Sequence, residues 1–545
     1  MKTKRILVFV SILVTALFIS GTVWAGGLPR QGDFPGKVKV LARGGPIHAT
    51  NGLSFGPDGN LYIASAHGHE IVAMDPDSGN ILERIGADQG VFFPDDLTFG
   101  PDGALYWTSI VFGQVMKRAP DGTVTSIADL GPGVNPITFS DDGRLFVALD
   151  FYGKGLYEVD PNGVNPPRAI LPDLVDLNGF DFGPDGLLYG PLFSDGRVVR
   201  IDVNTGAMST VADGFGIPAA AKFDSRGRLH IVDQATGQVV RVDTDTGKKK
   251  VIATLSNGLD NLAFNAQDRL FVSSWFDGGI VEVRAHGRAR TVSPSGLVSP
   301  AGVTTVPDRR GGESVWVADN VVLRQYAGRS GKLLMEHRPA IFGEHATPIT
   351  VSADGDNLVI SSWISGVVQV WDAQTGQVLE SYDVPNVALN AIRFQGDLIV
   401  AELVSGQVVR LTSSGRTPIA QFQVPTGMAA HGSDLWVADY AQGMVFQVLP
   451  DETTVPVASG LAGPEGLAVG QDGNLFVVES RAGRLSQIDL ATGEVSTIVE
   501  GLEFRQALPG EIPSLFLNGV AAGPSGAIYV TSDKANVLYR VTIHP

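Results

Sequence analysis

The sequence predicts an all-β fold arranged as two tandem six-bladed β-propellers. One pattern recurs twelve times along the 545 residues: a polar residue, an apolar β-type triplet, a tight turn and further β-runs. Each copy spans roughly 40 to 45 residues and holds about four short strands, which is typical of a propeller blade. Clear copies begin at Asn51, Asp95, Asn178 and Glu465.

The turns and strands within each copy support this prediction. Pro57-Asp58-Gly59, Pro101-Asp102-Gly103 and Pro184-Asp185-Gly186 place a proline, a turn-capping aspartate and a glycine in a row. This order favours a tight turn between two strands. Residues 61–65 and 105–109 are rich in β-branched and aromatic types, and beyond the N-terminus no apolar stripe with helical period competes with them.

Composition excludes several classes of partner. The formal net charge is -17 and the isoelectric point is about 4.9, so neither nucleic acid nor an anionic membrane surface would attract this chain. The 67 Gly and 32 Pro are spread over the repeat turns rather than gathered in a linker, which indicates that the mature chain is folded throughout. Without cysteine, disulfides and thiolate metal sites are impossible.

Residues 1–25 are expected to be a signal peptide rather than part of the fold. Lys2, Lys4 and Arg5 precede an apolar run over residues 6–19, and a small residue, Ala25, offers a cleavage site. An uncleaved anchor is the alternative, but the apolar run is short for a membrane span. The mature protein is therefore expected to be periplasmic or secreted, with no membrane association after cleavage.

Twelve copies divide naturally into two rings of six, because a single ring of twelve would leave a wide, poorly filled centre. We expect an N-terminal propeller over residues 26–290 and a C-terminal propeller over residues 291–545, with the crossover at residues 293–296. Residues 37–43 are expected to complete the sixth blade, and residues 288–292 the twelfth.

The polar residue that opens each copy is the main candidate for function. The first strand of a blade lines the axis, so six such residues converge at the mouth of the central channel. Aligned on this position, the first half gives Asn51, Asp95, Asn135, Asn178, Ala219 and Asp260. The second half gives Ala301, Thr347, Asn390, Thr426, Glu465 and Asn518.

In the first half, five of the six opening residues are Asn or Asp, and Asp96 and Asn261 add further oxygen atoms. Six to eight carboxylate and carbonyl oxygens are what Ca²⁺ prefers. The sequence thus predicts a calcium site. The alternative is that these residues only cap the turns into each strand.

These residues also carry a resemblance to known proteins. The first half resembles the calcium-dependent six-bladed propellers that include gluconolactonase, regucalcin and the paraoxonases, and the repeats resemble NHL-type and strictosidine-synthase-like blades. Asn178-Gly179-Phe180 and the pair Asp260-Asn261 are similar to metal-binding positions of that group, and Asn135 matches a further one. Asn51 stands where the group has a glutamate. The resemblance implies metal ligands at Asn51, Asn135, Asn178, Asp260 and Asn261.

The same resemblance implies hydrolysis of a lactone or ester, in which a bound cation polarises the carbonyl group. A base must then activate water. His48, His67 and His69 cluster in the first blade, and His67 is one candidate for the base. A carboxylate base at Asp95 or Asp96, as in gluconolactonases, is the other.

The second half keeps fewer oxygen donors at the opening positions. Asn390, Glu465 and Asn518 are candidate ligands of a second ion. The acids at the ends of second strands, Asp319, Glu402, Asp439 and Glu479, are expected to fix the blades. His345 and Trp363 are expected near the mouth of this ring.

The expected function is that of an exported, calcium-dependent hydrolase acting on a small-molecule lactone or ester. Two alternatives remain: a non-catalytic double propeller that binds a ligand or partner, and a propeller lyase. No G-x-S-x-G motif or cysteine nucleophile is present in the sequence. The oligomeric state is not predicted.

Overall fold

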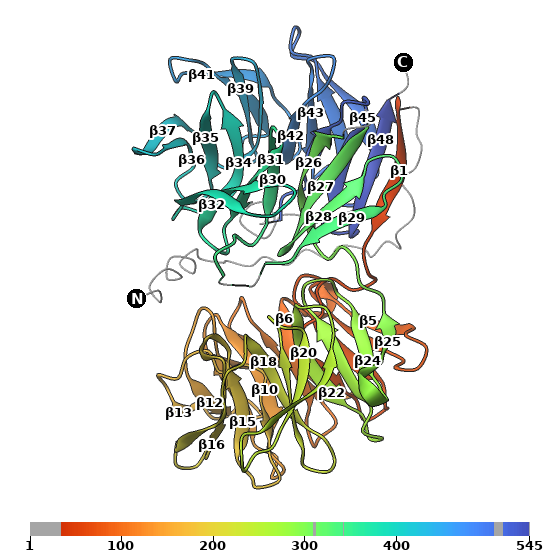
Figure 1. Cartoon of the computed structure of the whole chain (residues 1–545), viewed down its shortest axis with the longest axis vertical. Coiled ribbons are helices and arrows are strands. Elements are labelled where there is room, and N and C mark those ends of the chain that lie inside the picture. The colour runs from red at the N-terminus through yellow and green to blue at the C-terminus, as the bar shows by residue number, and fades with distance from the viewer. Residues whose placement is uncertain (1–33, 309–311, 340, 342, 506–515, 544–545) are drawn as a thin grey trace. The chain divides into compact units, whose positions relative to one another are not determined.

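The computed structural model describes residues 34–308, 312–339, 341, 343–505 and 516–543, which form an all-β protein (Figure 1). The expected signal peptide lies outside these residues. The described residues divide into two compact units, an N-terminal unit over residues 45–296 and a C-terminal unit that combines residues 34–44 with the described residues from 297 to 543. Among the described residues no helix has the length and apolar character needed to cross a bilayer.

The N-terminal unit contains six four-stranded sheets. Their strands are β2 (Leu53–Phe55), β3 (Leu61–Ser65), β4 (Glu70–Met74) and β5 (Ile81–Ile85); β6 (Pro94–Phe99), β7 (Leu105–Ser109), β8 (Gln114–Arg118) and β9 (Val124–Asp129); β10 (Val134–Phe139), β11 (Leu145–Leu149), β12 (Leu156–Val159) and β13 (Arg168–Leu171); β14 (Asp181–Phe182), β15 (Leu188–Leu192), β16 (Arg197–Ile201) and β17 (Met208–Ala212); β18 (Pro218–Phe223), β19 (Leu229–Asp233), β20 (Gln238–Val242) and β21 (Lys249–Thr254); β22 (Leu259–Phe264), β23 (Leu270–Ser274), β24 (Ile280–Val283) and β25 (Ala289–Ser293). Three single 3₁₀ turns accompany them: η1 (Ala87–Gln89), η2 (Phe193–Asp195) and η3 (Ala285–Gly287).

The C-terminal unit also contains six four-stranded sheets. Their strands are β26 (Pro300–Pro307), β27 (Glu313–Asp319), β28 (Val322–Ala327) and β29 (Leu333–His337); β30 (Thr350–Asp354), β31 (Asn357–Ser362), β32 (Val367–Asp372) and β33 (Val378–Asp383); β34 (Ala388–Phe394), β35 (Asp397–Glu402), β36 (Gln407–Thr412) and β37 (Gly415–Gln421); β38 (Pro425–His431), β39 (Asp434–Asp439), β40 (Met444–Val448) and β41 (Thr454–Ala458); β42 (Pro464–Val469), β43 (Leu475–Glu479), β44 (Arg484–Ile488) and β45 (Val495–Glu500); β46 (Val520–Ala522), β47 (Ile528–Ser532), β48 (Val537–Ile543) and β1 (Gly36–Arg43).

Every sheet is antiparallel, and eleven of them follow the chain order from first to fourth strand. The twelfth sheet is the exception, because its order is β1-β48-β47-β46 and β1 pairs along β48 from Gly36↔Ile543 to Arg43↔Val537. The expectation for residues 37–43 was therefore wrong: this strand completes the twelfth sheet. The expectation for residues 288–292 was also wrong, because residues 289–292 belong to β25, which pairs with β24 in the sixth sheet.

The tight turns form for the reason that the sequence indicated. In the first sheet the Asp58 Oδ1 atom accepts a hydrogen bond of 3.1 Å from the Asn60 backbone, and Gly59 takes the left-handed conformation that the turn requires. The core then lies between neighbouring sheets. Tyr106 and Val115 of the second sheet, for example, pack against Leu145 and Val147 of the third.

Inner strands of neighbouring sheets approach too closely for a side chain to fit between them. A Cβ added to Gly52 would meet the Asp96 Cα at 2.7 Å, and the Gly52 N–H donates to the Asp95 carbonyl oxygen at 2.8 Å. The same position is glycine in several other inner strands: Gly179, Gly302, Gly427, Gly466 and Gly519. This contact sets the spacing of the inner strands around each axis.

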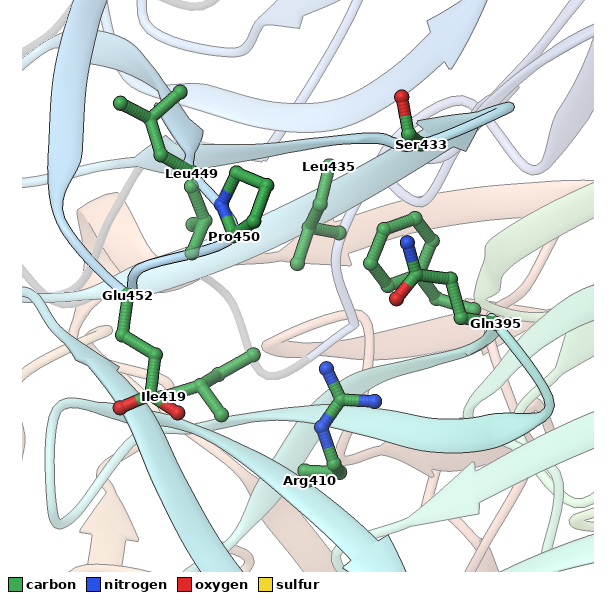
Figure 2. Close-up of a pocket in the computed structure, with 10 residues that line it drawn as sticks. Gln395, Arg410, Ile419, Ser433, Leu435, Leu449, Pro450 and Glu452 are labelled. Carbon is green, nitrogen blue, oxygen red and sulfur yellow. The ribbon is translucent and has the colours of Figure 1, made fainter.

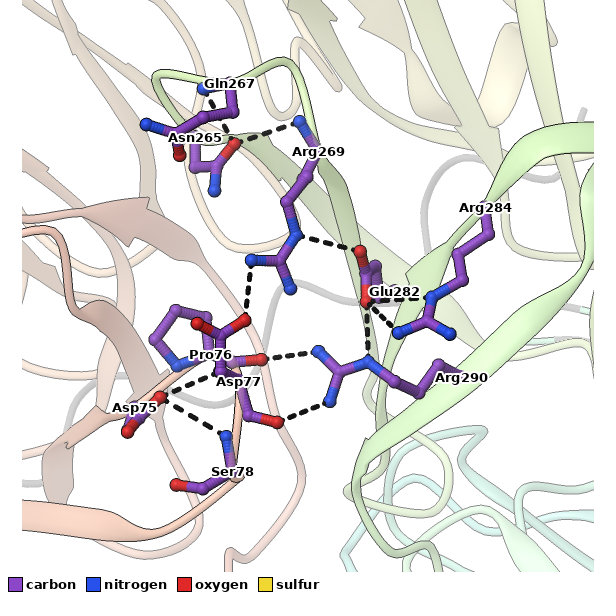
Figure 3. Close-up of polar contacts among 10 residues, drawn as sticks. All are labelled: Asp75, Pro76, Asp77, Ser78, Asn265, Gln267, Arg269, Glu282, Arg284 and Arg290. Atoms are coloured by element: carbon purple, nitrogen blue, oxygen red, sulfur yellow. Dashed lines mark hydrogen bonds and ion pairs between the residues drawn. The ribbon is translucent and has the colours of Figure 1, made fainter.

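The two units close by different means. In the N-terminal unit β2 of the first sheet contacts β22 of the sixth, and Ile63 packs in one cluster with Phe271 and Ile280. At the outer edge of this seam, the Arg290 guanidinium donates to the carbonyl oxygens of Pro76 and Asp77 while Glu282 holds it in place, as Figure 3 shows.

In the C-terminal unit β26 of the seventh sheet contacts β46, and Leu41 of β1 packs with Val303 and Tyr529. Closure of this unit therefore depends on a strand from the far end of the chain.

The acids at the ends of second strands have the structural role expected from the sequence. Asp319 accepts hydrogen bonds from the backbone of Val298 and Ser299, which enter the same sheet, and pairs with Arg324 at 2.8 Å. Glu479 likewise accepts hydrogen bonds from the Arg484 side chain and from the Ala462 N–H. Glu402 and Asp439 make equivalent contacts.

The closure by β1 leads to a prediction. Val40→Asp should lower the free energy of unfolding of the C-terminal unit by about 2 kcal/mol, because Val40 packs against the core of the last sheets and a carboxylate there would lose its hydration. Amide hydrogen exchange should show reduced protection in β46–β48 and unchanged protection in β6–β9. Lys39→Asp, on the exposed side of the same strand, is the control. Equal loss of protection in both units would contradict the closure described.

Candidate functional site at the axis of the N-terminal unit

The opening residues of the inner strands occupy one structural position, which we call the ring position. In most sheets a β-bulge marks it, since two residues of the inner strand face one residue of its neighbour, for example between Pro94 and Leu97. A bulge of this kind redirects side chains. In the N-terminal unit the ring position holds the six residues that the sequence alignment selected: Asn51, Asp95, Asn135, Asn178, Ala219 and Asp260.

A second feature accompanies the five polar ring residues. In each case the residue two places earlier has a positive φ: Ala49, Phe93, Gly133, Asp176 and Gly258. Three of these are not glycine, and a left-handed backbone at a bulky residue such as Phe93 is strained. Ala219 lacks this feature, because Ile217 is not among the residues with positive φ. Strain is thus concentrated where a polar side chain is presented.

Direct hydrogen bonds connect part of the ring. Asn51 Nδ2 donates to Asp95 Oδ1 at 3.0 Å. Asn135 Nδ2 donates to Asp150 Oδ2 at 3.0 Å and lies 3.4 Å from Asn178 Oδ1. Two carboxylates, Asp95 and Asp150, are therefore each held by a neighbouring amide group.

Sequence comparison of the opening residues missed Asp150. It follows the second strand of its sheet, β11, and returns to the same mouth as Asn135 because the two strands are antiparallel. Its Oδ1 atom is buried and has no hydrogen-bond partner among the described residues. The other acids near second-strand ends contact Arg side chains or backbone N–H groups that neutralise them. Asp150 instead precedes two aromatic residues, Phe151 and Tyr152, and this difference is the signal that the sequence offered.

Burial and mutual repulsion dominate the electrostatics of this ring. Burial, with the charge of Asp96, raises the pKa of Asp95 to about 7. Burial and the charges of Asp95 and Asp96 raise the pKa of Asp260, and burial and the charge of Asp95 raise that of Asp150 well above its usual range. Within the described chain, no cationic side chain offsets the shifts at Asp95 and Asp260.

Asp96 and Asn261 lie at the next position along their strands, where most other sheets have glycine. Asn261 Nδ2 donates to Asp96 Oδ1 at 3.2 Å, and Asp96 Oδ2 accepts the Ile137 N–H at 3.2 Å. The Asn261 Oδ1 atom accepts a hydrogen bond of 2.8 Å from the N–H of the next residue, Leu262. These two side chains therefore link sheets to one another beneath the ring position.

The three histidines lie at the mouth but not in the ring. The His67 ring packs edge-on against Trp275 with centroids 5.8 Å apart. His69 packs against Phe93 at 4.1 Å, and the carbonyl oxygen of His48 accepts the Ser65 hydroxyl. His67 is thus in the loop directly above the ring, while His69 belongs to an aromatic cluster.

The register of the C-terminal unit corrects the alignment at two places. The bulge in β34 lies between Ala388 and Asn390, so Leu389 rather than Asn390 occupies the ring position. Gly302 N–H donates to the Ile349 carbonyl oxygen, as Gly52 does to Asp95, and this places Ile349 rather than Thr347 in the ring. The ring of this unit is Ala301, Ile349, Leu389, Thr426, Glu465 and Asn518.

One half of that ring is apolar and the other half polar. Leu389 packs with Val387, Leu517 and Trp363, and the Trp363 ring contacts Phe516 at 5.9 Å. Opposite them, Asn518 donates to Glu465 Oε2 from both its backbone and its side chain at 2.7 Å. The candidate Asn390 lies outside this ring, with a buried Oδ1 atom that has no partner among the described residues.

Two further features of the C-terminal unit lie away from its axis. The His345 Nε2 atom donates a hydrogen bond to the Gly376 carbonyl oxygen at 3.0 Å, and its ring packs on Trp371 at 5.2 Å, so it does not face the mouth as expected. A pocket of about 100 Å³ lies between the third and fourth sheets of this unit, beside Arg410 and Glu452 (Figure 2). Arg410 is already paired with Asp397 at 2.8 Å.

The two axes differ in what they can do chemically. The N-terminal ring gathers buried carboxylate and amide oxygens without a neutralising cation, which suits a hard cation and proton transfer. The C-terminal ring presents one carboxyl group beside an apolar wall.

The buried carboxyl group of Glu465 gives a pH prediction. Burial, with the charge of Asp533, raises its pKa to about 8, so the folded protein binds a proton that the unfolded chain has lost above pH 4.5. The free energy of unfolding should then fall as pH rises from 4.5 to 8, by up to about 1.4 kcal/mol per pH unit. Glu465→Gln mimics the protonated group, so its stability relative to wild type should increase over this range in denaturant titrations. The exposed Glu494→Gln should follow the wild type; a parallel curve for Glu465→Gln would contradict a raised pKa.

Comparison with known proteins identifies the fold. The family model PQQ_2, described as outer membrane protein assembly factor BamB, matches residues 194–499. A search of curated proteins found no match.

Similar solved structures include a gluconolactonase from Xanthomonas campestris, with 17% identity over 44% of this chain and 86% of that one and a TM-score of 0.37. Regucalcin from Agrobacterium tumefaciens, described as a calcium-binding protein, has 20% identity over 44% and 86% and a TM-score of 0.36. A chain of a nidogen/laminin complex has 17% identity over 43% and 92% and a TM-score of 0.38.

The resemblance to this group of propeller proteins is thus confirmed, and at these identities it bears on the fold alone. The family model covers more than half of the 545 residues, and the twelve four-stranded sheets are those of propeller blades. The chain therefore belongs to the PQQ_2 family of β-propeller proteins, described as outer membrane protein assembly factor BamB.

Proposed function

We propose that this protein is an exported, calcium-dependent hydrolase that acts on a lactone or ester at the axis of the N-terminal unit. The observation that carries this proposal is a group of carboxylates at one mouth, Asp95, Asp150 and Asp260, whose pKa values are all raised by burial and by neighbouring carboxylates. Such a group is costly to keep charged, so it favours a bound cation, a bound proton or both.

The donor set supports a hard cation such as Ca²⁺. Asp260 and Asp150 supply carboxylate oxygens, and the Oδ1 atom of Asp150 lacks a partner among the described residues. Asn51, Asn135 and Asn178 add amide oxygens. In the part of the chain that the structure describes, no three His, Asp or Glu side chains are close enough to hold a metal by themselves. The proposed site therefore requires the amide oxygens as well. Asn261 would support it indirectly, since its side chain is bonded to Asp96.

A cation held by Asp260, Asp150 and the ring amides would polarise a substrate carbonyl group and stabilise the oxyanion that forms. Asp95 is the proposed general base, because its carboxylate lies at the same mouth and no cationic side chain of the described chain neutralises it. It removes a proton from a water molecule whose oxygen bonds to the carbonyl carbon. The carbon–oxygen bond to the alcohol breaks, and Asp95 returns the proton to the leaving oxygen. Asn51 orients Asp95 through the 3.0 Å hydrogen bond.

His67 is the second candidate for the base. Its place in the loop above the ring, against Trp275, allows it to exchange protons at the mouth. Asp96 is a positioning residue instead, because its carboxylate receives the Leu97 and Ile137 N–H groups and Asn261.

The proposal includes two closed six-bladed rings, one in each unit. The six sheets of each unit and the contacts of β2 with β22 and of β26 with β46 support this count. We also propose a periplasmic or secreted location with a small-molecule substrate, which the sequence features of residues 1–25 and the description of the matching family support.

A non-catalytic binding role is the second candidate. The observation that favours it is the C-terminal axis. Leu389 and Leu517 pack together there, and Glu465 is the one residue at the ring position of that unit with a carboxyl group. In that case the cation at the N-terminal axis would serve stability alone.

The proposed metal site can be tested through stability. Calcium at about one hundred times its dissociation constant should stabilise the N-terminal unit by roughly 2.7 kcal/mol, because an ion held only by the folded ring favours that state. Asp260→Ala should remove most of this shift in calorimetric melting curves. Asp213→Ala, an exposed aspartate of the same unit, should retain it. A full calcium response in Asp260→Ala would contradict the site.

The general base can be tested by kinetics on a panel of lactones and esters. Asp95→Asn should lower kcat by about 10²-fold or more, since it removes the proton acceptor. Asp96→Asn should mainly lower the melting temperature, because it weakens contacts between sheets. If kcat survives in Asp95→Asn and collapses in His67→Gln, the histidine is the base. If the wild type hydrolyses no member of the panel, the binding role replaces the catalytic one.

A further inference from the structure

Aromatic side chains surround the mouth of the N-terminal axis next to two of its carboxylates. We define the aromatic rim as Phe92, Phe93, Phe112 and Tyr152. Phe112 contacts Phe92 and Phe93 with ring centroids 5.9 and 5.6 Å apart, and all three are half-buried. Tyr152 is 46% exposed.

Backbone connections place this rim beside the ring position. Phe93 lies two residues before Asp95, and its carbonyl oxygen accepts the Ile110 N–H at 3.1 Å. The Ile110 carbonyl oxygen in turn accepts the N–H of Gly133 at 2.8 Å. Gly133 lies two residues before Asn135, and its carbonyl oxygen accepts the Asp150 N–H at 2.9 Å. One continuous run of loops therefore carries the aromatic side chains from Asp95 to Asp150.

Two residues in or next to the rim have a left-handed backbone conformation, and a backbone hydrogen bond fixes the loop that carries Tyr152. Phe93 and Phe151 both have a positive φ, at 46° and 51°. Immediately after Phe151, the Tyr152 N–H donates to the Asp150 carbonyl oxygen at 2.5 Å, which folds the loop back over the carboxylate.

The charge of the site indicates what the rim would bind. The four carboxylates of Asp95, Asp96, Asp150 and Asp260 outnumber the two positive charges of a divalent cation, and the whole chain has a formal charge of -17. A negatively charged substrate would be repelled. A positively charged group is attracted by the carboxylates and also by the faces of aromatic rings, which bind ammonium groups through cation–π interactions.

We propose that the substrate of this site is a cationic ester, in which the aromatic rim binds an ammonium group while the ring residues act on the ester carbonyl. This inference rests on the proposed hydrolase function and specifies its substrate class. The ammonium group remains unchanged in the reaction; water adds to the carbonyl carbon, and the amino alcohol leaves with the proton. Anionic esters and lactones are the disfavoured class.

Matched substrates test this proposal with the full-length, calcium-loaded protein. A choline ester and its neutral isostere, with a tert-butyl group in place of trimethylammonium, have the same shape and differ in charge. We expect kcat/KM to be about tenfold higher for the choline ester, and this preference to shrink in high salt. Equal values for the two esters would overturn the proposal.

Variants of Tyr152 separate aromatic binding from bulk. Tyr152→Phe keeps the ring and should keep the preference between the two esters. Tyr152→Leu keeps apolar volume without the ring and should reduce the ratio several-fold. Tyr382→Leu in the C-terminal unit is the control. A preference that persists in Tyr152→Leu would exclude the rim as its cause. The calcium-dependent melting shift, measured for each variant, checks that the ring itself is intact.

A binding experiment distinguishes failure of this inference from failure of the proposed function. Benzyltrimethylammonium, which cannot be hydrolysed, should bind the wild type in calorimetric titration and bind Tyr152→Leu more weakly. If no ester is hydrolysed but this cation binds in that pattern, the hydrolase function fails and the cation site stands. If neutral esters are hydrolysed and the cation does not bind, the hydrolase function stands and the cation site is overturned.

Discussion

The close approach of neighbouring inner strands is the constraint on which both axes depend. Where the chain has glycine after the ring position, as at Gly52 or Gly466, a Cβ would meet the next inner strand at less than 3 Å. This contact leaves no room for side chains between the strands, so the residue before it is the one presented to the axis. The position of Asn51, Asn178 or Glu465 thus follows from backbone packing, and their chemistry is added to it.

The two units show how the same scaffold supports different axes. In the N-terminal unit a residue with positive φ lies two places before each polar ring residue, and the carboxylates are left without a neutralising partner, at a cost in stability that structural acids avoid. Asp319 and Glu479 show the contrast, because Arg324 and Arg484 neutralise them. In the C-terminal unit, Leu389 and Leu517 instead fill part of the axis with apolar side chains. Carboxylates gathered at one mouth without a cationic partner therefore distinguish the N-terminal axis from the C-terminal one.

The sequence was sufficient for the repeat and for the N-terminal ring because one kind of turn, Pro-Asp-Gly in three of the six copies, follows the inner strand in every sheet of that unit. The two alignment errors fall in the C-terminal unit, in copies that lack this turn. Before Asn357 and Asp397 the turns are shorter, and a preference for polar residues shifted the alignment to Thr347 and Asn390, although Ile349 and Leu389 occupy the ring. Asp150 was missed because it follows a second strand, and antiparallel pairing alone brings it to the axis. The partner of β1 could not be predicted from neighbouring segments, because it lies at the opposite end of the chain.

That pairing makes the N-terminal unit an insertion within the C-terminal one. Gly36 pairs with Ile543, so nearly the whole chain separates the two strands that finish the last sheet. Synthesis starts at the N-terminus, so all strands of the inserted unit are made before those of the C-terminal unit are complete. During this time β1 has an unpaired edge, because its partner β48 is the last strand to be made. A chain that stops short of β48 would carry a complete axial site on an open partner ring. Full-length synthesis is then a condition for a protected strand edge, and quality control by proteases can act on that edge.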